Sequence, residues 1–216
     1  MVLPGHVARC RYHHRTLDAK KLVEVGFTRL PPRMTLARMI KLHRLPPAPA
    51  AAGLRPLTPA DVPAARDLVA NYLKRFRLAP VFSEEEFAHW LLPREGVVSS
   101  FVVVRQGADG AETITDFISY YHLHSSVLGN PKHSTLRAAY AFYNVATSMD
   151  LTELMRDALI LAKNEGMDVF NALDLMDNDE FLEALKFGRG DGNLQYYVYN
   201  WSCPAMEHGD VGLVLL

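Results

Sequence analysis

The fold of this chain is decided by the stretch Lys186-Phe187-Gly188-Arg189-Gly190-Asp191-Gly192-Asn193. Capping side chains, early acidic residues and an apolar face at helical spacing precede it at 177–185, which predicts a short helix. The aromatic and β-branched run at 194–201 follows it and predicts a strand. The predicted order is therefore helix, glycine loop, strand.

This order argues against a phosphate-binding role for the glycines. Nucleotide fingerprints place the loop after a strand and before a helix, because the helix N-terminus supplies the N–H groups that hold phosphate. Gly188 is expected to end the helix in a left-handed conformation, and Gly190 and Gly192 to allow a tight turn or the close approach of another backbone. The alternative that the glycines only form a turn, with no further role, also remains. The Arg-Gly-Asp tripeptide at 189–191 is also typical of integrin ligands, but no other feature of the sequence indicates an extracellular protein, so we discount this interpretation.

The composition is that of an ordinary globular protein. The chain has 216 residues, of which 49% are hydrophobic and 22% charged, enough to bury a sizeable core. No apolar run approaches the ~18 residues of a membrane span, so none is expected. Cys10 and Cys203 are expected to be free thiols, and the first ten residues show no secretory signal. We therefore expect a cytoplasmic protein.

The net charge of −1 hides an uneven distribution. Residues 1–44 hold ten of the 23 Lys and Arg residues but only Asp18 and Glu24 among the acids. The basic residues alternate with apolar ones, which indicates packed helices with a solvated face rather than a nucleic-acid site. The acidic remainder favours a cationic partner, such as a peptide with a free amino terminus and lysines.

The order of predicted elements indicates an α/β fold with a mixed sheet. Pro and Ala residues at 46–53 form the clearest linker, so we divide the chain into an N-terminal helical and linker segment, 1–52, and a domain, 53–216. The predicted helices cover 18–25, 35–43, 58–75, 83–92, 151–164 and 179–187. The predicted strands cover 54–57, 97–105, 113–122, 136–145, 168–173, 194–201 and 211–216, with a hairpin signal at 107–110.

Metal binding is not expected. His122 and His124 share one face of a predicted strand and His133 lies near in sequence, but no cysteine or carboxylate completes a set of zinc ligands. The acidic residues at 174–179 lack the glycine and distal glutamate of a calcium loop. We interpret both groups as structural.

Three motifs carry a resemblance to a known family. KFGRGDG at 186–192, NLQYYVYNW at 193–201 and GLVLL at 212–216 resemble the C-terminal signature of the eukaryotic N-myristoyltransferases, the glycylpeptide N-tetradecanoyltransferases. The resemblance extends upstream through 168–176, 138–144, 53–56 and 10–15 and so covers almost the whole chain. Nothing in the chain resembles the EINFLC-type motif of the family's acyl-CoA-binding half. The sequence therefore resembles the C-terminal half alone.

This resemblance implies a fold and a function. The fold is a mixed-sheet, acetyltransferase-like (GNAT) half of a two-half enzyme, and residues 1–52 would continue from a missing N-terminal half. The implied activity transfers myristate from myristoyl-CoA to the N-terminal glycine of target proteins. No cofactor is expected to bind tightly, and the co-substrate myristoyl-CoA would be held mainly by the missing half. The expected partners are N-terminal glycine peptides, with a complementary N-terminal half as a further candidate, and no nucleic acid is expected to bind.

The resemblance also implies the site residues. The catalytic base would be the C-terminal carboxylate, here on Leu216, and the apolar approach at 211–216 would raise its pKa by desolvation. Peptide-binding residues are those that match family motifs: Tyr12, His14, Phe27, Tyr121, Ser125, Tyr140, Asn171, Asp191 and Gly192. Each could also be structural, and His13 departs from the aromatic residue of other members. The alternative function is a truncated or non-catalytic module that binds N-terminal glycine peptides.

Overall fold

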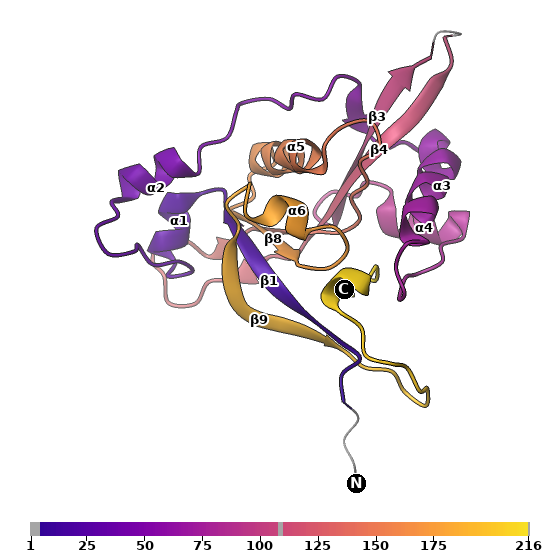
Figure 1. Cartoon of the computed structure of the whole chain (residues 1–216). Helices are drawn as coiled ribbons and strands as arrows, with labels where there is room; N and C mark the ends of the chain where they lie inside the picture. Colours follow the sequence, from indigo (N-terminus) through magenta and orange to yellow (C-terminus); the bar gives the residue numbers. More distant parts are fainter. Residues whose placement is uncertain (1–4, 108–109, 216) are drawn as a thin grey trace.

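The central sheet is buried on both faces at its middle. In strand β4 (Glu112–His122), five consecutive residues from Asp116 to Tyr120 are buried, as expected for a strand covered on both sides. The computed structural model describes residues 5–107 and 110–215. The part it describes contains a seven-stranded sheet (Figure 1). Its order is β2 (Leu54–Pro56), β3 (Val98–Gln106), β4, β7 (Ala138–Ala141), β8 (Val169–Leu173), β1 (Ala8–Thr16) and β9 (Gly188–Tyr196).

Strands β7 and β8 pair in parallel, and every other neighbouring pair in this sheet is antiparallel. The connection between β7 and β8 contains helix α5 (Leu151–Asn164), as a parallel crossover requires. The predicted fold class, α/β with a mixed sheet, is confirmed.

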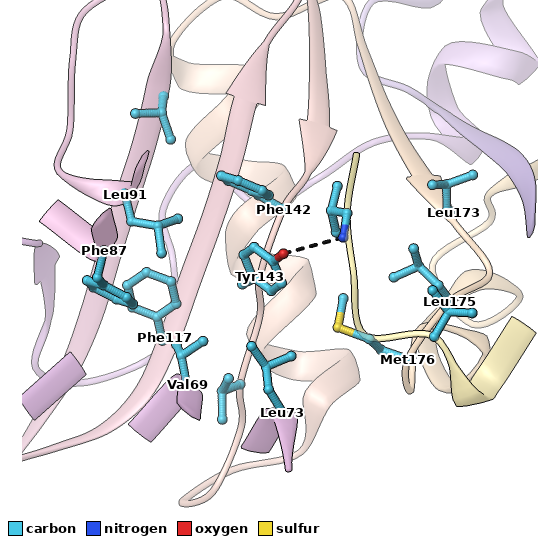
Figure 2. Packing of buried hydrophobic residues seen from close by; sticks show 14 of the residues in the cluster. Val69, Leu73, Phe87, Leu91, Phe117, Phe142, Tyr143, Leu173, Leu175 and Met176 are labelled. Atoms are coloured by element: carbon cyan, nitrogen blue, oxygen red, sulfur yellow. Dashed lines mark hydrogen bonds between the residues drawn. The ribbon is translucent and has the colours of Figure 1, made fainter. Parts of the chain in front are cut away.

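The core has a layer on each face of the sheet. Helices α3 (Val62–Leu73) and α4 (Glu84–Leu91) pack on one face with Phe117 of β4, whereas α5 and α6 (Asp179–Leu182) pack on the other with Ile118. Figure 2 shows the first layer, in which residues of α3 and α4 meet residues that follow β7 and β8. Consecutive residues of one strand therefore enter different layers.

The shorter elements lie around this sheet. They are α1 (Ala19–Glu24), α2 (Leu36–Leu42), the 3₁₀ turns at Pro59–Asp61 and His208–Asp210, and the strand pair β5 (Ser125–Ser126) and β6 (Thr135–Leu136). The helix predicted at 18–25 is present as α1, and the Asp18 side chain caps it by accepting a hydrogen bond from Lys21 N. Thr35 caps α2 in the same way. None of the helices in the described parts of the chain is long and apolar enough to cross a membrane.

Strand β1 is the main element that the sequence did not predict. It lies inside the sheet between β8 and β9, although its polar and aromatic residues lack the β-branched pattern of a strand. Residues 46–53 connect α2 to β2, and Asp157 of α5 accepts hydrogen bonds from Ala50 N and Ala51 N. The division into 1–52 and 53–216 stays a prediction, but β1 pairs on both sides with strands of the second range.

The glycine stretch differs from its prediction. Strand β9 begins at Gly188, so the glycines lie inside the strand and not in a loop before it. The left-handed residue is Lys186, with φ of 64°, and not Gly188. The predicted helix at 179–187 is shorter, because α6 ends at Leu182. The local sequence pattern predicted the helix and the strand in the right order, but it placed the end of the helix and the start of the strand too late in the sequence.

Two further strand predictions are corrected in part. The strand predicted at 136–145 is regular only over β7, and Val145 adds an isolated bridge to Phe117. The described part of the predicted strand at 211–216 forms no strand, and Val211 makes a single parallel bridge to Leu78. Of the predicted hairpin turn at 107–110, residues 108–109 lie outside the described residues.

Candidate functional site

Residues from five neighbouring strands align in one row across the sheet. The register pairs Tyr121 of β4 with Tyr140 of β7, Tyr140 with Asn171 of β8, Asn171 with His14 of β1, and His14 with Gly188 of β9. Because directly paired residues point to the same face, the four side chains lie on one side of the sheet. Sequence ranges far apart therefore meet, and four of the predicted peptide residues are neighbours.

Aromatic contacts join this row. The rings of Tyr121 and Tyr140 are stacked with centroids 5.1 Å apart, and Tyr12 meets Tyr140 edge-on at 6.3 Å. Burial raises the pKa of Tyr12, Tyr121 and Tyr140. All three phenols therefore stay protonated at neutral pH, so each can donate or accept a hydrogen bond.

The polar part of the row is His14 with Asn171. His14 Nδ1 lies 2.6 Å from Asn171 Oδ1, so the amide oxygen accepts a hydrogen bond from the ring when Nδ1 carries the proton. A hydrogen bond with the Asn171 side chain also partly offsets the raised pKa of Tyr140. Phe27, which follows α1, meets the His14 ring edge-on at 5.5 Å. The imidazole is thereby contacted from two sides.

The glycines of β9 let the strand pass close to His14 and Tyr12. A Cβ atom on Gly190 would lie 2.5 Å from His14 Nε2 and 2.8 Å from Tyr12 O, and one on Gly192 would lie 3.4 Å from Tyr12 Cδ2. No other residue fits at 190 without displacing backbone. The close approach predicted from the sequence is therefore present, and it occurs at His14 of the row and at Tyr12.

A hollow of about 670 Å³ opens beside His14. Its lining comes from β1, the segment after α1, helix α2 and the start of β9. The lining residues are His14, Thr16, Phe27, Thr28, Met39, Leu42, His43, Lys186, Phe187, Gly188, Arg189, Gly190 and Asp191. Three predicted peptide residues, His14, Phe27 and Asp191, thus face one hollow, which we call the His14 hollow.

A buried arginine supports the wall of this hollow. Arg15 is 3% exposed and donates hydrogen bonds to Leu185 O, Thr16 O and His43 O, and to His43 Nδ1 at 2.7 Å. It thereby ties β1 to α2 and to the turn before β9. Burial lowers its pKa to about 10, and burial with the charges of Arg15 and Lys186 lowers the pKa of His43 to about 4. His43 is therefore neutral at neutral pH and accepts the bond from Arg15.

Two predicted residues are not brought into the row. Ser125 is exposed in β5 and pairs with Leu136 of β6, apart from the seven-stranded sheet. Leu216, which would carry the catalytic carboxylate, lies outside the described residues. The segment before it is described to Leu215 and lines an apolar hollow of about 300 Å³ with Phe82, Trp90, Phe142 and Tyr143. Contacts from Tyr143 to Phe142 and from Phe142 to Tyr121 connect this hollow to the row.

Sequence reasoning missed several residues at the site. Arg15, His43 and Thr28 gave no local signal, because their roles depend on elements far apart in sequence. His122 was considered as a metal ligand, but its Nε2 lies 3.0 Å from Ser99 Oγ, which also donates to Glu165. Within residues 5–107 and 110–215, no group of three or more His, Cys, Asp and Glu is placed to hold a metal ion.

Comparisons with known proteins agree on one family. The sequence profile of the myristoyl-CoA:protein N-myristoyltransferase C-terminal domain matches residues 24–214. Glycylpeptide N-tetradecanoyltransferase 2 of Bos taurus is 56% identical over 215 residues, which are 100% of the chain and 42% of that protein. The Drosophila melanogaster enzyme is 53% identical over 100% of the chain and 45% of that protein. The chain thus spans about half the length of these curated relatives.

A solved structure gives the same result. Saccharomyces cerevisiae N-myristoyltransferase with bound myristoyl-CoA superimposes with a TM-score of 0.92 at 38% sequence identity. The match covers 100% of the chain and 59% of the yeast chain. The chain therefore corresponds to one part of a longer enzyme.

The first prediction concerns Gly190. We expect Gly190→Ala to lower the free energy of unfolding by about 1–3 kcal/mol, because the new methyl group meets His14 and the backbone of Tyr12. The matched control is Gly188→Ala in the same strand, where a Cβ atom would only contact His14 O at an ordinary 3.8 Å. Urea unfolding of both variants measures the difference. Equal stability of the two variants would contradict the close approach.

The second prediction concerns the pH dependence of stability. The pKa of His43 is lowered from 6.5 to about 4 in the folded chain, so the unfolded chain takes up this proton first as pH falls. The stability that neutral His43 confers is thus present at pH 7 and is lost progressively between pH 6.5 and about 4. His43→Gln keeps an acceptor for Arg15 without titrating. The stability advantage of the unmodified chain over this variant should shrink over that window, and a constant difference would refute the assignment.

Proposed function

Because the chain belongs to the myristoyl-CoA:protein N-myristoyltransferase family, as its C-terminal domain, we propose that it forms the peptide-binding half of such an enzyme. The enzyme would transfer myristate from myristoyl-CoA to the N-terminal glycine of target proteins. The observation that supports this proposal is the row of Tyr121, Tyr140, Asn171 and His14 next to the His14 hollow. This row offers ring faces and hydrogen-bonding groups, as a peptide main chain needs.

The proposed peptide contacts follow from this geometry. The N-terminal glycine would lie toward the tail at 211–215, and later peptide residues would lie over the row and in the His14 hollow. The connection through Tyr143, Phe142 and Tyr121 supports a single continuous path. The proposed contact residues are Tyr12, His14, Phe27, Tyr121, Ser125, Tyr140, Asn171, Asp191 and Gly192.

The proposed chemistry needs a base. An α-ammonium group with a pKa of about 7.7–8.0 must lose its proton before the amine can attack the thioester carbonyl carbon. The C–N bond then forms, the C–S bond breaks, and CoA leaves as a thiolate that takes up a proton. We propose the carboxylate of Leu216 as the base. In water the transfer to a carboxylate of pKa ~3.5 is uphill by roughly 5–6 kcal/mol, and desolvation would reduce this difference.

The other half of the reaction is assigned to a complementary N-terminal half. The yeast relative was solved with myristoyl-CoA bound, and the present chain matches 59% of it. We propose that the missing half holds most of this co-substrate, and that no other cofactor is needed. The apolar hollow near Leu215, with Trp90 41% exposed and Val81 93% exposed beside it, supports a partner surface there. The cytoplasmic location stays a prediction.

The third prediction tests the function directly. The chain should bind a Gly-Ser-Lys-type peptide in calorimetry, and N-acetylation of the glycine should weaken binding, because it removes the ammonium group. Mixing the chain with an N-terminal half of a relative should then transfer labelled myristate to the free peptide only.

The outcomes of this test separate the two functional hypotheses. Binding with no transfer, when both pieces are folded, would leave the non-catalytic module as the function. Equal binding of free and acetylated peptides would contradict both. His14→Ala serves as a positive control for the row, with weaker peptide binding expected, while Ser126→Ala lies outside the proposed contacts.

The fourth prediction concerns the terminal carboxylate. Adding one residue after Leu216, or amidating it, should reduce the rate of the chemical step by about 10²–10⁴-fold in the reconstituted enzyme, the usual contribution of a general base. Leu216→Gln keeps the carboxylate and should cost little. Single-turnover kinetics measures the step without product release. Full activity of the amidated chain would return the role to a side chain such as His14 or Asp191.

A further inference from the structure

The segment before the C-terminus is fixed without being part of a sheet. Gly212 N donates to Leu78 O at 2.7 Å, and Val211 O accepts from Met176 N at 3.1 Å. Val211 is fully buried and Val214 is 7% exposed. The segment, which we call the tail (residues 211–215), thus runs between the chain after α3 and the turn after β8.

The path of the tail is also restricted by packing. A Cβ atom on Gly212 would lie 2.9 Å from Phe76 Cδ2 and 3.0 Å from two further atoms of that side chain. Only glycine lets the tail pass this ring unless the ring moves. The first part of the tail is therefore located by backbone hydrogen bonds and by one aromatic ring.

The second part of the tail is held by two tyrosine hydroxyl groups instead. Tyr196 Oη donates to Leu213 O at 2.6 Å. The next residue, Val214, donates from its N–H to Tyr143 Oη at 3.3 Å, the bond drawn as a dashed line at Tyr143 in Figure 2. Tyr196 comes from the end of β9, and Tyr143 follows β7. Consecutive backbone groups of the tail are thus bound by side chains from two different parts of the sheet.

Both tyrosines are themselves well fixed. Tyr143 is 1% exposed and Tyr196 is 3% exposed. The backbone of Tyr143 exchanges hydrogen bonds with Ser119 Oγ, and its ring packs against Phe82 and Phe142. Burial raises the pKa of Tyr143 to about 12 and raises that of Tyr196 as well. The two hydroxyl groups therefore keep their protons at any physiological pH.

A purely hydrophobic role does not explain the hydroxyl groups. A phenylalanine would fill either ring position, but the part-buried Leu213 carbonyl or the buried Val214 N–H would then lose its partner, at a cost in stability. Among the strands in the described parts of the chain, none pairs with these two residues and could replace the bonds. The hydroxyl groups thus perform the function of a strand partner.

We propose that Tyr143 and Tyr196 are positioning residues, a phenol clamp that holds residues 213 and 214, the segment that leads to the proposed base. This role rests on the proposed function, in which the group that follows the clamp accepts the proton from the substrate amine. A base must lie within about 2.6–3.2 Å of the proton donor, so a shift of 1 Å in the tail slows the reaction.

The clamp is tested first in the chain alone, without any assumption about activity. Hydrogen exchange followed by NMR should show the Val214 amide protected relative to the amide of Leu215. In Tyr143→Phe, exchange at Val214 should be about 3- to 10-fold faster, the range expected for one lost hydrogen bond. Tyr196→Phe should also speed exchange at Val214, because it releases the neighbouring carbonyl.

The matched control is Tyr197→Phe. It removes a phenol hydroxyl one residue from Tyr196, but that hydroxyl is exposed and bonds Gln195. Exchange at Val214 in either clamp variant equal to that in Tyr197→Phe would overturn the clamp. If Tyr143→Phe does not fold, the unmodified chain still decides, since equal exchange at Val214 and Leu215 would overturn it.

The consequence for catalysis is tested in the reconstituted enzyme. The clamp variants should lower kcat by about 10-fold or more while the KM for the peptide changes less than 3-fold, since the peptide row is untouched. A general loss of structure would change both values. Unchanged kcat in variants with a released tail would overturn the positioning role. No transfer by the unmodified enzyme would refute the proposed function and leave the exchange result standing.

Discussion

The antiparallel pairing of β1 with β8 and β9 is the interaction on which the rest of the structure depends. Strand β1 comes from the start of the chain and both of its neighbours come from the last quarter, so this pairing closes the sheet over the whole sequence. It sets His14 opposite Asn171 and Gly188, and a slip of one residue would turn His14 to the other face. The candidate site and the sheet are therefore specified by one register.

The buried Arg15 shows how this register reaches the wall of the His14 hollow. Arg15 lies next to His14 in β1 and so points to the opposite face, where no carboxylate among the described residues pairs with it. Its charge is instead satisfied by three carbonyl groups and the neutral imidazole of His43. Buried charge is costly unless fully hydrogen-bonded, so the carbonyl of Leu185 and the end of α2 must stay in place around it. One strand thus contributes His14 to the row on one face, and from the other face it holds His43, which lines the hollow.

Local patterns predicted most helices and strands, because caps, apolar periodicity and turn residues act over a few neighbours. The helix at 18–25 and the strands around 97–122 are examples. Strand β1 could not be predicted in this way, since its polar and aromatic residues become a strand only when β8 and β9 bind them. The glycines of β9 were misplaced for the same reason: their role is set by the ring of His14, 176 residues before Gly190 in the chain. The motif resemblance identified the family and proposed the residues of the row, but no local pattern indicated that Tyr143 and Tyr196 would bond the tail.

The role proposed for the tail illustrates a general constraint on using the end of a chain as a functional group. A terminus lacks covalent support on one side, so it frays unless other contacts replace the missing chain. Pairing the tail with a strand would supply such contacts, but the backbone of that strand would also cover the side chains next to the tail. Side-chain hydroxyl groups supply the same hydrogen bonds from a distance, and they leave the apolar hollow beside Leu213, Val214 and Leu215 open. Because burial keeps both phenols protonated, this support does not vary with pH in the range where an α-amine titrates. Under the proposed mechanism, the base that follows residues 213 and 214 would respond to pH through its own proton and that of the substrate, while the support of these two residues stays constant.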